Sequence, residues 1–305
     1  MVVYVDPKFI GRDNYNRLVK KYSNIEFVTD VDRKSELEVL ITMPKIVKEM
    51  NLDDYPRLKW IQYLMAGYDG LDFSELRKRN ITFCNAQDIF SKSIAEDVFA
   101  KILYFNRNIK YYLESMKEGK WEPIGEEPEL TGSTVLILGV GSIGKELAKR
   151  FKAFEMNVIG YRSNYIEEKN FDKIITKTIE LKEALKIADY VVLALPLTET
   201  TKYMFDKSMF EIMDQNALLI NVARGKIVNQ EDLYQALLNK QIRGAGLDVL
   251  DPEPLPSDSP LWKLPNVYIT PHNASSSPHM RNRLYNMIIM NLDLYLSGEP
   301  VKYQL

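Results

Sequence analysis

The sequence predicts an α/β fold with two domains, each built on a parallel β-sheet. Short β-branched apolar runs alternate with amphipathic stretches almost from end to end, which is typical of βαβ units. A long helical pattern interrupts this alternation after about the first third of the chain. The length of 305 residues also exceeds the usual size of one domain.

The first alternating block precedes the long helical pattern. Its apolar runs are brief and bounded by Asp, Pro or Asn, as buried parallel strands tend to be. A helix is expected at Tyr15–Lys21. Strands are expected at Val2–Val5, Ile25–Val28, Val39–Thr42, Lys59–Leu64 and Ile81–Cys84.

One long helix is expected next, because apolar residues recur at spacings of four and three from Ile94 to Met116 and Gly119 is a typical helix end. A second alternating block then runs to about Thr270, and a last helix is expected at about Met280–Leu296. Strands of the second block are expected at Thr134–Leu138, Asn157–Tyr161, Tyr190–Ala194, Ala217–Ile220 and Val267–Thr270, and the run that begins at Gly246 is also strand-like before it becomes rich in proline.

Composition excludes several classes of function. The formal net charge of −2 gives no bulk reason to bind nucleic acid or an anionic membrane. The single cysteine, Cys84, cannot form a disulfide within the chain and does not provide a thiolate metal site, so no metal is expected. No signal peptide and no apolar run long enough for a membrane helix is visible, and a cytoplasmic location is therefore expected.

A glycine-rich turn follows the strand Thr134–Leu138. Gly139, Gly141 and Gly144 form a Gly-x-Gly-x-x-Gly pattern, which also contains Ser142 and Ile143, and a helix is expected at Lys145–Phe154. Strand, glycine pattern and helix in this order indicate a dinucleotide site, in which the helix N-terminus faces the pyrophosphate.

The residue that reads the adenosine ribose is expected where the next strand, Asn157–Tyr161, ends. An acidic residue there would accept hydrogen bonds from the 2′-hydroxyl of NAD, but the chain has Arg162 followed by Ser163. A guanidinium can pair with the 2′-phosphate of NADP, and a hydroxyl can add to this contact. NADP(H) is therefore favoured and NAD(H) stays possible; the alternative is an exposed arginine in a surface loop.

Three further segments carry candidate catalytic side chains. Arg224 follows an apolar strand, where it could clamp a carboxylate and polarise the adjacent carbonyl. His272, better placed than His279, is a candidate proton donor, with Glu253 as the carboxylate that would orient it. Taken singly, a histidine in the position of His272 would more often be structural, and Glu253 between two prolines would be read as an exposed loop residue.

The motifs taken together identify a resemblance. In order and spacing the chain resembles the D-isomer-specific 2-hydroxyacid dehydrogenase family along nearly its whole length. Asp248 and Glu253 lie five positions apart, as in the family's motif. The stretches that carry the resemblance are Leu138–Gly144, Leu195–Thr201, Asn221–Gly225, Leu247–Pro254 and Thr270–His272.

The resemblance implies a catalytic triad of Arg224, Glu253 and His272, in which His272 is the acid–base and Arg224 binds the substrate carboxylate. It places Asp248 near the nicotinamide carboxamide. It also implies that Ala66 and Gly67, in the loop Met65–Asp69, bind the substrate carboxylate through backbone N–H groups, together with Arg224 and His272. The remaining cofactor contacts that it implies are Leu195, Pro196, Thr201, Val222 and Ala223.

The family's architecture implies a Rossmann domain at 98–275 and a smaller flavodoxin-like substrate domain at 1–97 plus 276–305. The helix from about Ile94 to Lys117 resembles the family's dimerisation arm, which implies a homodimer; packing on its own domain is the alternative.

Two departures from the family's usual pattern bear on specificity. Arg162-Ser163 resembles the NADP-dependent glyoxylate and hydroxypyruvate reductases of the family. Asn273–Ser277, after His272, differs from the usual Gly-x-x-Thr.

The expected function is reduction of a small 2-keto acid to a D-2-hydroxy acid. The alternatives are a NAD-dependent D-lactate-type or phosphoglycerate-type dehydrogenase and, in another class, a non-catalytic nucleotide-sensing protein similar to the corepressors of this superfamily.

Overall fold

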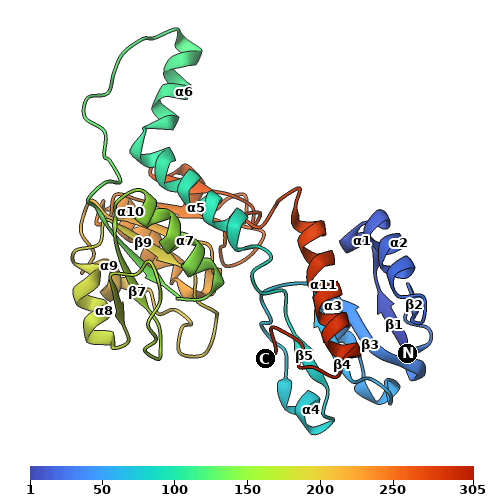
Figure 1. The fold of residues 1–305 in the computed structure, drawn as a ribbon. Coiled ribbons are helices and arrows are strands. Elements are labelled where there is room, and N and C mark those ends of the chain that lie inside the picture. The colour runs from blue at the N-terminus through green and yellow to red at the C-terminus, as the bar shows by residue number, and fades with distance from the viewer. The chain divides into compact units, whose positions relative to one another are not determined.

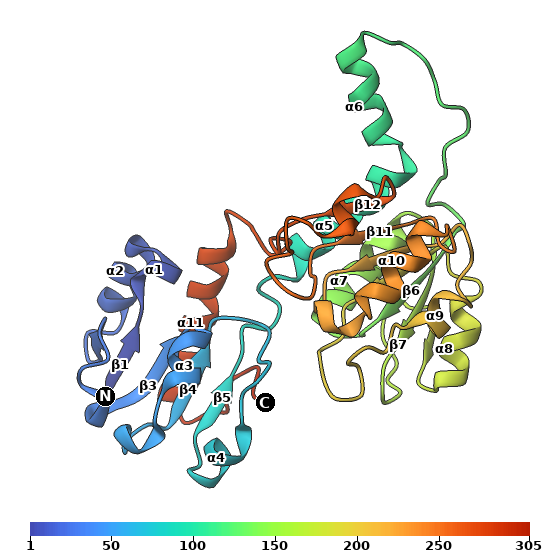
Figure 2. The ribbon, with the colours of Figure 1, turned by 180° about the vertical axis from the view of Figure 1, so that it is seen from behind.

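The computed structural model describes residues 1–305, which form two compact units (Figures 1 and 2). The first consists of Met1–Phe90 and Ser276–Leu305, and the second of Ser91–Ser275. The expected division placed residues 91–97 in the first domain. They lie in the second unit because helix α5 begins at Ser91 and packs on that unit's sheet and on α7.

The first unit contains a five-stranded parallel sheet in the order β2-β1-β3-β4-β5, which is the flavodoxin-like order. This part of the predicted fold is confirmed. The strands are β1 (Val2–Val5), β2 (Glu26–Val28), β3 (Leu37–Thr42), β4 (Trp60–Tyr63) and β5 (Thr82–Cys84). The helices are α1 (Pro7–Ile10), α2 (Arg12–Lys21), α3 (Pro44–Glu49), α4 (Phe73–Lys78) and α11 (Met280–Leu296), with 3₁₀ turns at Lys34–Glu36 and Leu52–Asp54.

The C-terminal segment belongs to the first unit through specific contacts. Helix α11 lies beside α1 and α2 in both views, and Lys21 pairs with Asp293 at 2.8 Å (Figures 1 and 2). Buried Asn291 donates to Gln62 Oε1 at 2.7 Å. Gln304 pairs in antiparallel fashion with Cys84, so the chain end covers the edge of β5.

The second unit contains a seven-stranded parallel sheet in the order β12-β11-β10-β9-β6-β7-β8. This order is the doubly wound Rossmann arrangement with one extra strand, β12, and it confirms the predicted fold class. The strands are β6 (Thr134–Leu138), β7 (Asn157–Tyr161), β8 (Lys173–Ile175), β9 (Tyr190–Leu193), β10 (Leu218–Asn221), β11 (Gly244–Leu247) and β12 (Val267–Ile269). The strand β8, which has three residues and lies at the sheet edge, was not predicted from the sequence.

Helices cover both faces of this sheet. The helices of the unit are α5 (Ser91–Asn106), α6 (Ile109–Glu118), α7 (Ser142–Ala153), α8 (Thr178–Leu185), α9 (Lys207–Phe210) and α10 (Gln230–Leu238), with 3₁₀ turns at Gly225–Ile227 and Pro260–Lys263; of these, α6 does not cover the sheet. The interior strands are apolar along their length because both faces are buried. One large apolar core joins the inner sides of α8, α9 and α10 to the sheet.

The prediction of one long helix from Ile94 was wrong. The chain turns into the left-handed region at Asn108 (φ 45°) between α5 and α6. Asparagine tolerates this conformation better than most residues. The apolar spacing continues on both sides of the break, so the pattern does not reveal it. The predicted end at Gly119 is confirmed, because this glycine caps α6 with φ 66°.

No helix of the chain has the length and apolar character needed to cross a membrane.

Candidate active site

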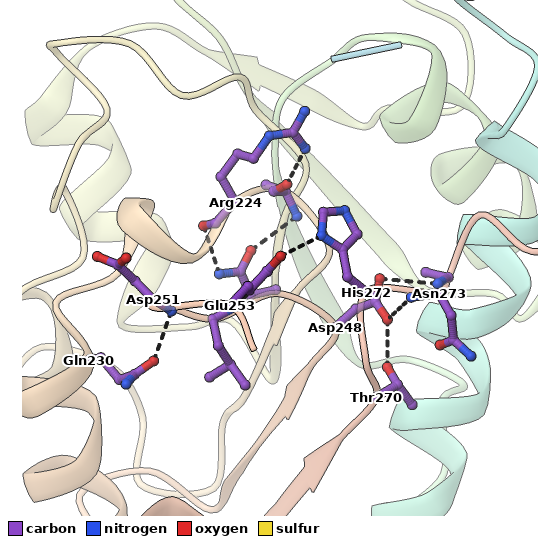
Figure 3. Close-up of polar contacts among 12 residues, drawn as sticks. Arg224, Gln230, Asp248, Asp251, Glu253, Thr270, His272 and Asn273 are labelled. Atoms are coloured by element: carbon purple, nitrogen blue, oxygen red, sulfur yellow. Dashed lines mark hydrogen bonds and ion pairs between the residues drawn. The ribbon is translucent and has the colours of Figure 1, made fainter. Parts of the chain in front are cut away.

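Three neighbouring parallel strands, β10, β11 and β12, carry the candidate catalytic residues at their carboxyl ends. Arg224 follows β10, Asp248 follows β11, and His272 follows β12 (Figure 3). Glu253 lies in the loop after β11 and reaches back toward His272 (Figure 3). Ligands of open α/β sheets bind at this edge, so the fold brings the four side chains to the expected place.

The turn that presents Arg224 is held by the buried amide of Asn221. Asn221 donates to the carbonyl of Arg224 at 3.1 Å and accepts from the N–H of Ala223 at 3.1 Å. Gly225 lets this turn approach the next loop, because a Cβ there would lie 2.0 Å from the carbonyl oxygen of Leu250. The turn that carries Arg224 therefore packs directly against the loop that carries Glu253. The Arg224 side chain is also held locally, because its Nη1 donates to the carbonyl of Ala223 at 2.6 Å.

Glu253 and His272 form the central polar contact. His272 Nδ1 lies 2.8 Å from Glu253 Oε2, and the N–H of Leu250 donates to the other carboxylate oxygen at 3.0 Å (Figure 3). Since a carboxylate can only accept a hydrogen bond, Nδ1 carries the hydrogen of this bond. The other ring nitrogen, Nε2, takes no part in the contact with Glu253. The His272 side chain is 48% exposed, which leaves Nε2 accessible to a small molecule.

Asp248 organises the loop that carries His272. Its side chain accepts from Thr270 Oγ1 at 2.6 Å and from the N–H groups of Asn273 and Ala274 at 3.0 and 3.1 Å. The N–H of His272 donates to the Asp248 carbonyl at 2.8 Å. These contacts hold His272 in the left-handed region (φ 50°), which is unusual for a residue other than glycine.

The glycine turn has the shape that a dinucleotide pyrophosphate requires. Gly139 has φ 109°, and a Cβ there would lie 2.5 Å from the Ala194 carbonyl oxygen. A Cβ at Gly144 would lie 2.1 Å from the carbonyl oxygen of Gly139, so β6 and α7 pack closely. The space beside Gly141 is open, and no side chain caps α7, which begins at Ser142 and Ile143. The free N–H groups of this helix end fit an anionic group.

The other proposed cofactor contacts lie on neighbouring loops of the same sheet edge. Leu195, Pro196 and Thr201 follow β9, which pairs with β6. Thr201 Oγ1 donates to the Pro196 carbonyl at 2.7 Å and fixes this loop. Val222 and Ala223 follow β10 and are buried.

Arg162 lies at the end of β7, the strand next to β6. Its backbone N–H donates to the Ile175 carbonyl at 3.1 Å. Its side-chain Nε is buried and has no hydrogen-bond partner, whereas Ser163 is exposed. A buried, unsatisfied guanidinium nitrogen is unusual, and an anionic ligand would satisfy it.

Ala66 and Gly67 belong to the first unit, in the loop after β4. The loop is held by the segment that follows β5: Asn85 Nδ2 donates to the Ala66 carbonyl at 2.8 Å, and the N–H of Ala86 donates to the Met65 carbonyl at 3.0 Å. Their contact with substrate stays a prediction.

One buried polar group of the second unit was not predicted from the sequence. Lys101 on α5 is completely buried and donates to Thr270 Oγ1 at 2.8 Å. The only signal in the sequence is the spacing of four between Asp97 and Lys101 within an otherwise apolar helix face. No group of three His, Cys, Asp or Glu side chains that could hold a metal ion is present.

Comparison with known proteins gives one family. Residues 99–274 match the NAD binding domain of the D-isomer specific 2-hydroxyacid dehydrogenases. A glyoxylate reductase of Korarchaeum cryptofilum is 35% identical over 282 residues, which cover 90% of this chain and 82% of that protein.

Two solved structures are similar over the whole chain. One is a D-isomer specific 2-hydroxyacid dehydrogenase family protein from Aeromonas salmonicida, with 31% identity, a TM-score of 0.85, and coverage of 100% of this chain and 98% of the other. The second is an acyclic imino acid reductase in complex with NADPH and D-arginine, with 27% identity, a TM-score of 0.86 and complete coverage of both chains.

Proposed function

Because this chain belongs to the D-isomer specific 2-hydroxyacid dehydrogenase family, we propose that it uses NADPH to reduce a small 2-keto acid, such as glyoxylate or hydroxypyruvate, to the corresponding 2-hydroxy acid, which is the D-isomer where the product is chiral. The observation that carries the proposal is the 2.8 Å contact between Glu253 and His272, beside Arg224, at the carboxyl edge of the same sheet as the glycine turn.

NADPH, when bound, supplies the hydride that the carbonyl carbon of the substrate receives. Arg224 binds the substrate carboxylate and polarises the neighbouring carbonyl oxygen. Protonated His272 delivers a proton from Nε2 to that oxygen, while Glu253 keeps the imidazole oriented through Nδ1. The glycine turn and the N-terminus of α7 hold the pyrophosphate, and Asp248 holds the nicotinamide carboxamide.

The substrate class follows from the resemblance and from the Korarchaeum relative, which is named a glyoxylate reductase. Oxidation of NADPH at 340 nm should be measured with glyoxylate, hydroxypyruvate, pyruvate and branched 2-keto acids. Turnover with glyoxylate or hydroxypyruvate is expected to be the fastest. The proposal fails if the chain binds NADPH but turns over none of these acids, or only 2-imino acids. Binding without turnover would favour the nucleotide-sensing alternative.

We propose that Arg162 selects NADP over NAD. Arg162→Asp should raise KM for NADPH about 10- to 100-fold, because it replaces a charge-assisted contact to the 2′-phosphate by repulsion. The same carboxylate can accept from the 2′-hydroxyl of NADH, so KM for NADH should fall. Steady-state kinetics with both cofactors measure the change.

Lys149→Asp is the matched control, since Lys149 is an exposed cation further along α7 and carries the same change of charge. It should leave both KM values close to the native ones. An unchanged preference for NADPH in Arg162→Asp would contradict the assignment of this residue.

We propose that the arm formed by α6 and residues 119–130 binds a second copy of the chain. The arm stands away from the sheet of its own unit (Figures 1 and 2). Leu113 (52% exposed) and Met116 (74%) lie on one face of α6, and Trp121, just beyond its end, is 99% exposed. An apolar patch of this kind marks an interaction site, and a symmetric dimer is the commonest way to cover it.

Size-exclusion chromatography with light scattering should give twice the chain mass for the native protein. The double variant Leu113→Asp, Met116→Asp should be a monomer, because it places charge in the apolar contact. Ile187→Asp is the control, since Ile187 is an exposed residue (62%) on a different surface. A native monomer at micromolar concentration would contradict the proposal.

A cytoplasmic location also stays a proposal.

A further inference from the structure

A lysine lies in the interior of the second unit, where charged side chains are rare. Lys101 on α5 has no solvent exposure. Its ammonium donates to Thr270 Oγ1 at 2.8 Å and to the Asp97 carboxylate one helical turn earlier. Gly246 of β11 makes room for the stem, because a Cβ there would lie 2.9 Å from Lys101 Cβ.

The contacts of Lys101 continue to the loop of His272. Thr270 uses its only hydroxyl hydrogen to donate to Asp248 Oδ1 at 2.6 Å, so its oxygen is free to accept from Lys101. The carboxylate of Asp248 then accepts the N–H groups of Asn273 and Ala274, which follow His272 directly (Figure 3). An uninterrupted series of hydrogen bonds therefore joins α5 to the backbone that directly follows His272.

The charges of this cluster explain why it needs a cation. Asp248 is 3% exposed, and a buried carboxylate is unfavourable unless it is paired or hydrogen-bonded. Burial raises the pKa of Asp97, the hydrogen bond from Lys101 opposes this rise, and the charge of Asp248 adds to it. Lys101 donates directly to Asp97 and is linked to Asp248 through the hydroxyl of Thr270.

We propose that Lys101 is a positioning residue for the reduction: through Thr270 and Asp248 it fixes the loop that holds His272. The inference rests on the proposed function, because it takes His272 as the proton donor and Asp248 as a cofactor contact. Lys101 itself touches neither substrate nor cofactor in this assignment. Its loss should therefore lower kcat through misplacement of His272, with the fold preserved.

The test uses Asp97→Asn as the reference protein, so that Asp97 is not left as an unpaired carboxylate when Lys101 is replaced. In that background we compare Lys101→Met, Thr270→Val and the two together. Each single change should lower kcat for glyoxylate or hydroxypyruvate roughly 10-fold, in line with the effect of a small misplacement. In the double variant, kcat should also fall roughly 10-fold, and not by the product of the two single losses, because both changes break the same series of contacts.

Amide hydrogen exchange gives a readout that does not depend on turnover. Exchange at Asn273 and Ala274 should accelerate by about 10-fold or more in each variant, since these N–H groups lose a fixed acceptor. The inference is overturned if Lys101→Met keeps kcat within about twofold of the reference, if the two losses multiply, or if the exchange rates do not change.

The two proposals fail in different ways. If neither the native protein nor the reference reduces any 2-keto acid, the proposed function is wrong, and the exchange rates alone decide the role of Lys101 in holding the loop. If the reference turns over normally and the Lys101 variants match it in rate and exchange, the function stands and the positioning role is wrong.

Discussion

Replacing His272 by alanine is expected to lower kcat for 2-keto acid reduction by about 10²- to 10⁴-fold, the usual contribution of a general acid. His272 is the side chain that Glu253 orients, at 2.8 Å, and its other ring nitrogen remains to deliver a proton. Cofactor affinity should change little, because the glycine turn and the N-terminus of α7 are on other loops. Steady-state kinetics and fluorescence titration with NADPH separate the two effects.

His279→Ala is the natural control, because the chain has only two histidines. His279 precedes α11 in the first unit and its side chain makes no capping hydrogen bond. This variant should keep kcat close to the native value. Native turnover by His272→Ala would show that another group provides the proton.

Replacing Arg224 by alanine is expected to lower kcat/KM for the keto acid by about 10²- to 10⁴-fold, which corresponds to the 3–5 kcal/mol of a desolvated ion pair that loses one partner. Both constants should change. KM rises because the substrate carboxylate loses its charged partner, and kcat falls because the carbonyl is no longer polarised. Initial rates over a wide range of substrate concentration measure both.

Lys226→Ala removes a cation two positions further along the same turn, from an exposed side chain. It should leave kcat/KM nearly unchanged and so controls for loss of positive charge near the site. If Arg224→Ala affected only the KM for NADPH, Arg224 would be a cofactor contact and not the substrate clamp.

Much of the architecture could be predicted because interior parallel strands have a strong sequence pattern. Thr134–Leu138 and Asn157–Tyr161 were predicted to the residue, and helix Met280–Leu296 likewise. The edge strand Lys173–Ile175 is too short to give a pattern. The break at Asn108 was missed because the apolar face of α5 continues in α6, and a single left-handed residue leaves no trace in hydrophobic spacing.

The candidate site could be assembled in part from the order of the strands. Residues that follow β10, β11 and β12 must meet at one edge, since these strands are parallel neighbours. The sequence does not contain the packing that buries Lys101, because the fit depends on Gly246 from a distant strand. The buried state of Arg162 Nε was equally invisible, since it follows from how the end of β7 folds.

The most direct measurement is reduction of hydroxypyruvate by NADPH with the configuration of the product determined by chiral chromatography. We expect D-glycerate, formed in equal amount to the NADPH oxidised. Hydride delivery in one fixed arrangement gives a single enantiomer, and the proposed function specifies the D-isomer. Formation of L-glycerate, or oxidation of NADPH without any glycerate, would contradict the proposed function.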